Sequence, residues 1–351
     1  MLELIGEPTA IILLGLIGGT VLGLAARLGG FCTLGMIEDV HYGDDRARLW
    51  FWVGALGIAI LSNFWLSYAG LIDLGAVVYL QNAFSIPGAI LGGLIFGFGM
   101  AQTGNCGFTA LARVGGGDLR AFVIAMVMGV AALIALSGLL AVWRLEIFPI
   151  TPQPQSPDGI AQMLGRLFGL SPDLLGMGIG TIVIVAAIAL APRHGAIKRI
   201  LWSIAIGLTI SLGFFGTYWV SENGWDAWPV VSHTFTAPIG ETLHYAMFST
   251  GLAPKFGMGS VLGVVMGGFI GSLIKGGFRW EACEDPRELR RQIIGAAMMG
   301  LGAVMAAGCS IGQGLSAFSV LSPTAPLVAA SIWLGAWFGL RQLILGLAPE
   351  V

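Results

Sequence analysis

Charged side chains are scarce in this sequence. Asp, Glu, Lys and Arg together make up 10% of the 351 residues, whereas hydrophobic residues make up 56%. A soluble domain carries roughly 25% charged residues, so this composition excludes an ordinary water-exposed surface. Uncharged apolar stretches recur at roughly the 20 residues that a helix needs to cross the hydrocarbon core. The sequence therefore predicts an integral membrane protein.

Motifs that depend on clustered charges or ligands are missing as well. The net charge of −2 gives no basis for nucleic-acid binding. The four cysteines form no CxxC pair and have no histidine at metal-ligand spacing, so we expect no disulfide scaffold, no metal site and no other cofactor. The N-terminal stretch is acidic and lacks the cleavage motif of a signal peptide, which makes it the expected first span.

Hydropathy predicts one all-α membrane domain over residues 1–351, with about nine full crossings and short broken or re-entrant helices. Prolines exclude a continuous helix over 144–173, which we expect to be a loop. Residues 221–256 are amphipathic and interrupted, and we expect them to re-enter the membrane or to lie on it. The expected crossings are 8–27, 50–70, 86–104, 121–143, 174–191, 200–220, 257–275, 293–307 and 322–341.

Lys and Arg are unevenly divided between the expected loops. With the N-terminus outside, the inner side holds 14 of the 17 basic residues, and the outer side holds Arg144, Arg166 and Lys255. Inner loops of membrane proteins carry an excess of Lys and Arg. The sequence therefore predicts an N-terminus outside and a C-terminus in the cytoplasm.

Two pairs of segments resemble each other. Residues 23–33 align without gaps on 207–217, with six identical positions, and Cys32 falls on a glycine. Residues 90–106 align on 293–309, and both copies end on a cysteine. In the nine-crossing topology, the two members of each pair run through the membrane in opposite directions.

This pattern predicts two halves of inverted topology. We expect a first pseudo-repeat at 8–143, a connector with one span at 144–199, and a second pseudo-repeat at 200–341. Inverted repeats are typical of transporters whose site lies near the bilayer midplane, at broken helices.

Three of the four cysteines stand in glycine-rich breaks. Cys32, Cys106 and Cys309 each end an apolar run and open a segment that is able to start a new helix. Amide groups at a helix N-terminus suit an anion without Lys or Arg, and cysteine adds a soft sulfur with a weak S–H donor. A lone cysteine in a membrane helix is more often an apolar filler, but three in matched settings favour a ligand path. Cys283 lies in a charged loop, and we expect it to be incidental.

Residues beside these cysteines are further candidates for the path. Their donors are able to bind an anion, although each polar side chain is equally able to cap its own helix. Glu38 and Asp39 follow the first cysteine motif, where a solvated inner loop is the favoured interpretation over an intramembrane acid. The candidate path residues are Cys32, Cys106, Cys309, Thr33, Gly104, Asn105, Gly107, Gly308, Ser310 and Gln313.

Other polar residues flank the expected path on both sides of the membrane. Arg113 and Arg120 are expected to set the orientation and are able to draw an anion to the inner exit. Trp225, His233 and His244 fall in the outer segment and are candidates for an entrance cap.

The motifs at 30–40, 103–121 and 306–323 resemble the YeeE/YedE sulfur-transport family of bacterial inner-membrane proteins, and their spread covers about residues 10–341. The resemblance implies an all-helical fold of two inverted halves that narrow at the centre. It implies uptake of thiosulfate rather than an enzymatic reaction, with the three cysteines passing the anion along by S–H contacts. A cytoplasmic sulfur-carrier protein is an implied partner, besides the lipid bilayer.

The chemistry of thiosulfate fits such a path. Its terminal sulfur is soft and poorly hydrated, while its oxygens need hard donors. Thiols for the sulfur and helix-end amides for the oxygens would distinguish it from sulfate, which has no such sulfur. Several weak sites also conduct better than one tight site.

Other functions stay open. The substrate is alternatively selenite, sulfite, sulfide or a soft metal ion such as Cu(I), although no Met or His clusters flank the cysteines. A membrane thiol oxidoreductase needs two cysteines within bonding distance, and the closest pair in sequence, Cys283 and Cys309, is 26 residues apart. A purely structural or receptor role would not explain the inverted repeat or the three matched cysteines.

Overall fold

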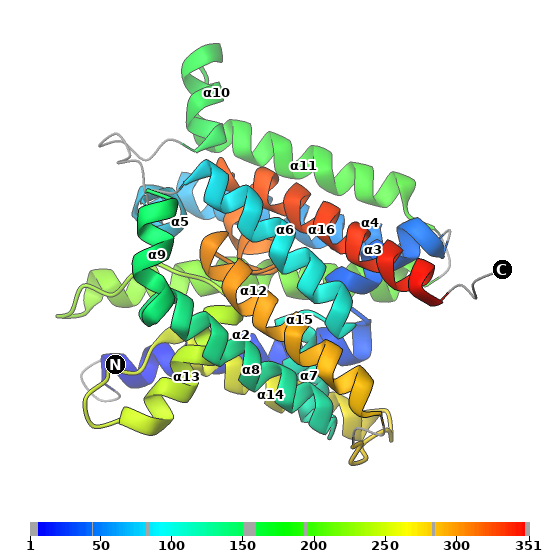
Figure 1. Ribbon diagram of the computed structural model, residues 1–351. Coiled ribbons are helices and arrows are strands. Elements are labelled where there is room, and N and C mark those ends of the chain that lie inside the picture. The colour runs from blue at the N-terminus through cyan, green and yellow to red at the C-terminus, as the bar shows by residue number, and fades with distance from the viewer. Residues whose placement is uncertain are drawn as a thin grey trace.

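The computed structural model describes residues 6–43, 45–81, 85–149, 159–192, 195–282 and 285–347. Every named element in these ranges is a helix (Figure 1). The elements of the first part are α2 (Glu7–Leu24), η1 (Ala25–Gly29), α3 (Thr33–Tyr42), α4 (Ala47–Tyr68), η2 (Leu74–Ala76), α5 (Val78–Gln81), α6 (Ile86–Thr103), α7 (Gly107–Gly115), α8 (Leu119–Leu136) and α9 (Leu139–Ile147).

The second part of the chain continues the helical bundle. Its elements are α10 (Ile160–Phe168), α11 (Pro172–Leu190), α12 (Ala196–Asn223), α13 (Thr236–Phe248), α14 (Phe256–Ile274), α15 (Pro286–Met305), η3 (Gly312–Ala317) and α16 (Thr324–Leu347). Of these, η1 and η3 are π-helices, and each lies next to one of the cysteine-bearing breaks. Such widened turns are frequent at functional sites.

Eight helical segments in the described ranges are long and apolar enough to cross a membrane. The predicted all-α integral membrane fold is therefore confirmed, with eight such segments where hydropathy gave about nine. The expected crossing 293–307 lies in α15, whose first turns carry Arg287, Glu288, Arg290 and Arg291. These charges leave 14 uncharged residues, 292–305, so α15 by itself falls short of the roughly 20 apolar residues of a full span.

Close helix packing depends on small residues. Helix α2 packs on α14, α4 on α11 and α12, and α6 on both α15 and α16. A Cβ atom at Gly97 of α6 would overlap the carbonyl oxygen of Ile332 on α16. Only glycine permits the two backbones to approach so closely. Membrane helices associate through such close packing, because lipid supplies no hydrophobic driving force between them.

Helices α6 and α15 cross at matched glycines. A Cβ at Gly92 would lie 2.7 Å from the carbonyl oxygen of Gly302, and a Cβ at Gly99 would lie 2.5 Å from that of Gly295. In the sequence alignment, Gly92 corresponds to Gly295 and Gly99 to Gly302. Each contact is thus repeated with the partners exchanged, as a two-fold axis between the helices requires. This pairing supports two related halves, whose boundaries stay a prediction.

The first aligned pair is less well matched in the structure. Cys32 stands at the break before α3, whereas Gly216 lies inside the continuous helix α12 and faces Leu14. The break that precedes α13 falls later, at 224–235. Similar glycine-rich sequence therefore placed the second copy of this break too early.

Two expected segment boundaries also differ from the structure. The expected crossing 121–143 is divided at Ser137 and Gly138 into α8 and α9. The expected loop 144–173 contains the end of α9 and all of α10, because no proline falls within Ile160–Phe168. Prolines do prevent one continuous helix here, but a short helix fits between them.

Candidate functional site

Cys32 occupies the N-cap of α3. The preceding Gly30 has a φ of 75°, in the left-handed region that ends η1, and Cys32 itself is extended. The Sγ atom of Cys32 accepts a hydrogen bond from the backbone N–H of Gly35 at 3.4 Å. The sulfur thus takes the place of the Ser or Asp oxygen that usually caps a helix. As the sequence predicted, this cysteine opens a new helix.

Cys106 has a similar position at the start of α7. Helix α6 ends at Gly104, which has a φ of 72°. The backbone N–H of Cys106 donates to Thr109 Oγ1 at 3.0 Å, and the Thr109 hydroxyl lies 3.5 Å from Cys106 Sγ. Thr109 also lies close to Cys32, and both residues line the polar cavity described below. One hydroxyl therefore lies between two of the three thiols.

Cys309 follows a strained turn at the end of α15. Ala307 has a φ of 53°, a conformation that residues with a Cβ rarely adopt. The Cys309 Sγ atom accepts a hydrogen bond from the N–H of Gly312 at 3.4 Å, and it lies 3.6 Å from Thr234 Oγ1. A Cβ at Gly312 would meet both Thr234 Oγ1 and the Tyr79 hydroxyl. The third thiol is therefore surrounded by two hydroxyls and a freed amide.

Thr234 and Tyr79 are functional candidates that the sequence analysis missed. Neither residue lies in a cysteine motif, and Tyr79 precedes Thr234 in the sequence by more than 150 residues. The available signal was the run of polar residues Ser232, His233 and Thr234 directly before α13. The run enters the core, where Ser232, His233 and Phe235 are buried.

A polar cavity of about 230 Å³ lies beside Cys32. The thiol, Thr109 and Gly104 form part of its wall. Basic residues outnumber acidic ones around it, which gives the cavity a positive field suited to an anion. The charged residues that line it are Arg27, Arg48, Arg113 and Glu38.

The expected solvated loop at Glu38 and Asp39 is not observed. Both residues lie on α3, Glu38 lines the polar cavity, and Asp39 forms an ion pair with Arg48 at 3.2 Å. The helix continues because Cys32 caps it, so the acidic residues remain in regular structure.

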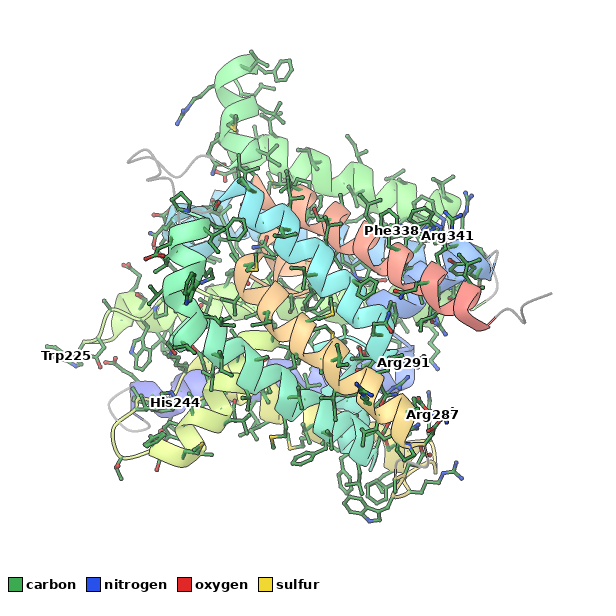
Figure 2. All side chains as sticks on the ribbon, viewed as in Figure 1. Trp225, His244, Arg287, Arg291, Phe338 and Arg341 are labelled. Carbon is green, nitrogen blue, oxygen red and sulfur yellow. The ribbon has the colours of Figure 1, made fainter. Side chains whose placement is uncertain are left out.

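A second cavity of about 170 Å³ continues from the polar one. Gly104 and Arg113 line both cavities. Arg120 and Arg291 line the second, where Arg120 also lies 3.9 Å from Glu288. Figure 2 shows Arg291 near one end of the bundle, so polar residues extend from Cys32 towards this basic end.

Buried phenylalanines connect the three loops. The rings of Phe31 and Phe108 are 6.3 Å apart, and those of Phe108 and Phe235 are 5.2 Å apart. Phe31 precedes Cys32, and Phe235 follows Thr234, the neighbour of Cys309. A series of aromatic rings therefore links the polar cavity to the third thiol.

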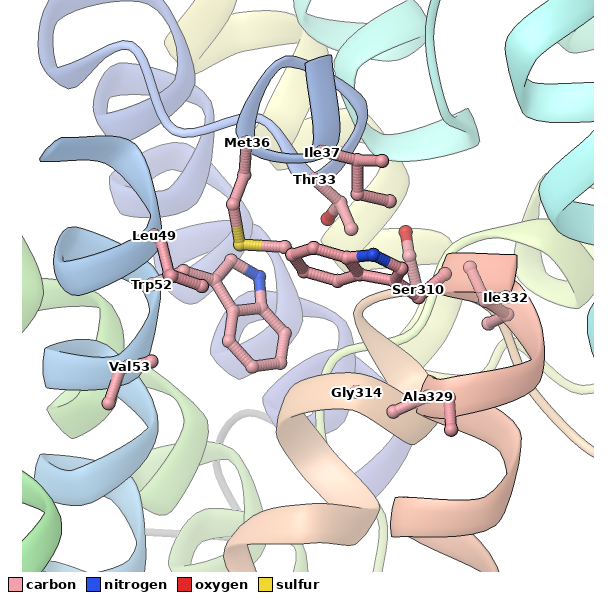
Figure 3. A pocket seen from close by; sticks show the side chains of 12 residues that line it. Thr33, Met36, Ile37, Leu49, Trp52, Val53, Ser310, Gly314, Ala329 and Ile332 are labelled. Atoms are coloured by element: carbon pink, nitrogen blue, oxygen red, sulfur yellow. The ribbon is translucent and has the colours of Figure 1, made fainter. Parts of the chain in front are cut away.

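Thr33 and Ser310 line a different cavity from that of the thiols. This cavity has a volume of about 240 Å³, and apolar side chains form most of its wall. Figure 3 shows Thr33 and Ser310 on one side of it and Trp52 on the other. The structure thus separates these two hydroxyls from the polar cavity beside Cys32.

The remaining candidate residues shape the breaks. Asn105 Nδ2 donates to the Thr103 carbonyl at 3.3 Å, and Gln313 Nε2 donates to the Ala307 carbonyl at 2.9 Å. A Cβ at Gly107 would lie 2.6 Å from Met128 Cε, and a Cβ at Gly308 would lie 2.9 Å from Gln313 Cγ. These contacts favour a structural role beside the thiols. Cys283 lies outside the described residues.

The three entrance-cap candidates are separated in the structure. His233 is buried, and its Nδ1 lies 2.6 Å from Ser260 Oγ. Trp225 is 94% exposed, and Figure 2 places it and His244 at the edge of the bundle. His233 therefore belongs to the core rather than to a cap.

Comparison with known proteins identifies the family. A family model described as sulphur transport matches residues 28–338. The thiosulfate transporter TsuA of Escherichia coli (strain K12) is 26% identical over an alignment of 371 residues, which covers 96% of this chain and 93% of that protein. The thiosulfate transporter TsuA of Spirochaeta thermophila is 24% identical over 335 residues, which covers 92% of this chain and 96% of that protein. The chain therefore belongs to the sulphur transport family.

Proposed function

We propose that this chain takes up thiosulfate, or a closely related small sulfur anion, through the bilayer. Its family membership and its membrane-spanning helices support transport of a sulfur compound. The observation that carries the proposal is the placement of three free thiols, each at the start of a helical segment. The chain acts as a transporter in this proposal, and no enzymatic step is needed.

The thiols form the path in this proposal. At Cys32 and Cys309, the sulfur already accepts a backbone N–H, so its own S–H is able to donate to an arriving anion. Partial positive charge at the helix starts stabilises the anion without a lysine at the midplane. Each contact is weak, which allows the anion to leave as easily as it binds.

The polar cavities form the inner end of the path. Arg113 lines both, and Arg27 and Arg291 add to the positive field, whereas Arg48 and Arg120 form ion pairs with nearby carboxylates. Such a field raises the local concentration of an anion and draws it away from the last thiol. We therefore assign this end of the bundle to the cytoplasmic side.

The same assignment gives the orientation in the bacterial inner membrane. Figure 2 shows Arg287, Arg291 and Arg341 towards one end of the bundle and Trp225 and His244 towards the other. In Figure 1 the last turns of α16 lie at the basic end and the start of α2 lies at the opposite end. The positive-inside rule then favours an N-terminus outside and a C-terminus in the cytoplasm. A cytoplasmic sulfur-carrier protein would receive the anion there.

A thiol oxidoreductase is the second candidate, because Thr109 contacts both Cys32 and Cys106. This pair is closer than sequence spacing suggested. In the structure both are free cysteines, as is Cys309. In the transport proposal, Cys32 and Cys106 contact the anion one after the other and do not act as a redox pair.

The test is transport by the purified full-length chain in liposomes. We expect uptake of radiolabelled thiosulfate that excess unlabelled thiosulfate abolishes and excess sulfate leaves almost unchanged. Stronger competition by selenite or sulfite than by thiosulfate would assign the alternative substrate. Absence of any anion flux would contradict the proposal.

A further inference from the structure

Three hydrogen-bond donors that lack partners lie in the wall of the cavity shown in Figure 3. It lies between α3, α4, α16 and the segment around η3. Among the described residues, Thr33 Oγ1, Trp52 Nε1 and Ser310 Oγ are buried atoms without a hydrogen-bond partner. The side chains of Thr33 and Ser310 are only 5% and 3% exposed. All three residues line this one cavity.

Three such donors on one cavity are a cost to the fold. A buried polar group without a partner destabilises a protein by about 1–3 kcal/mol, so natural structures contain few of them. The rest of the wall offers no relief, because it consists of residues such as Met36, Ile37, Leu49, Val53 and Ile332. An arrangement of this kind is typical of a binding site, where the ligand supplies the missing acceptors.

We propose that this cavity binds a small anion with a sulfonate-type head, –SO₃⁻, and a short soft or apolar remainder. Three donors match three oxygens on one centre. Since Thr33 is the first residue of α3, the partial positive charge of that helix start adds to the attraction. The site is distinct from the polar cavity beside Cys32, which has arginines in its wall.

The apolar wall selects the remainder of the ligand. The thioether of Met36 and the rings of Trp52 and Trp333 offer soft, polarizable surface. Trp333 is not a fourth donor, since its Nε1 already donates to His41 at 2.9 Å. Sulfate exposes a fourth oxygen to this wall, where it would find no partner, so it should bind less well than thiosulfate or methanesulfonate.

The position suggests a role beside the thiol path. Thr33 follows Cys32 and Ser310 follows Cys309, so the same two backbone breaks serve both places. Occupation of the cavity would stiffen these breaks and hold the two thiols in place. This role rests on the proposed transport function, whereas binding itself does not.

The experiment is calorimetric titration of the purified full-length chain with methanesulfonate, which keeps the –SO₃⁻ head but lacks the terminal sulfur that thiols would recognise. The variants Thr33→Val, Trp52→Phe and Ser310→Ala each remove one donor. Each should weaken methanesulfonate binding by about tenfold, the effect of one hydrogen bond to a charged group. None should lower the melting temperature, because each replaces an unpartnered donor.

The matched control is Ser331→Ala, since this buried serine on α16 already donates to the Leu327 carbonyl at 2.9 Å. The control should bind methanesulfonate as the unaltered chain does. The proposal would be overturned if all three donor variants bound methanesulfonate as tightly as the unaltered chain does. A cavity that takes up only water or lipid would overturn it as well. Donor-dependent binding in a chain that fails to transport thiosulfate would support the site and reject the transport function.

Discussion

Cys309 Sγ and Thr234 Oγ1 lie 3.6 Å apart, although 75 residues separate them in the sequence. The contact joins the break after α15 to the largely buried segment 232–235 before α13. It places a hydroxyl beside the third thiol, as Thr109 lies beside Cys106. In the proposed path, each of these two threonines places a hard hydroxyl next to a soft sulfur.

The Thr234→Val variant tests this pairing. Valine keeps the shape of the side chain but removes the hydroxyl, so thiosulfate uptake should fall roughly 2- to 10-fold, the effect of one hydrogen bond. Thr242→Val is the control, because the Thr242 hydroxyl donates to the Pro238 carbonyl and faces no thiol. Initial uptake rates in liposomes give the comparison, and equal rates for both variants would assign Thr234 a structural role.

The Arg113→Gln variant tests the field of the polar cavities. Because Arg113 lines both, its loss should slow uptake on the order of threefold or more at low ionic strength. Added salt should reduce this difference by screening. Arg341→Gln is the control, since Arg341 stacks over Trp337 at 5.6 Å. A salt-independent defect in Arg113→Gln would contradict an electrostatic role.

The Phe108→Leu variant tests the aromatic series. Leucine keeps the site apolar and should cost about 1.5 kcal/mol or less in stability. A gap between Phe31 and Phe235, which Phe108 now connects, should admit sulfate or chloride, which the proposed path excludes. Phe269→Leu, which alters an exposed ring on α14, should leave the selectivity unchanged. Anion leak into liposomes measures the difference, and unchanged selectivity in both variants would remove these rings from the path.

Much of the architecture was predictable because hydropathy reports directly on the bilayer. The apolar runs gave the all-α membrane fold, and the glycine-rich settings of Cys32, Cys106 and Cys309 gave the three helix starts. The one expected crossing that does not meet the length and composition of a full span is the one at α15, because charged residues occupy its first turns.

Contacts across the bundle could not be predicted in the same way. The meeting of Thr234 with Cys309, and of Thr109 with Cys32, depends on where separate loops enter the core. The separation of Thr33 and Ser310 from the polar cavity depends on which way each side chain leaves its helix start. Sequence spacing predicts neither these contacts nor these directions. The side chains of adjacent residues at a helix start point in different directions.

The most direct test of the account is thiosulfate uptake by cells that depend on thiosulfate as their sole sulfur source. They would carry Cys32→Ser, Cys106→Ser or Cys309→Ser, with Cys283→Ser as the control. Serine keeps the size and a donor but removes the sulfur. The account predicts that the first three variants lose most of their uptake and growth while Cys283→Ser retains both. Full uptake by all four variants would contradict a path built on thiols.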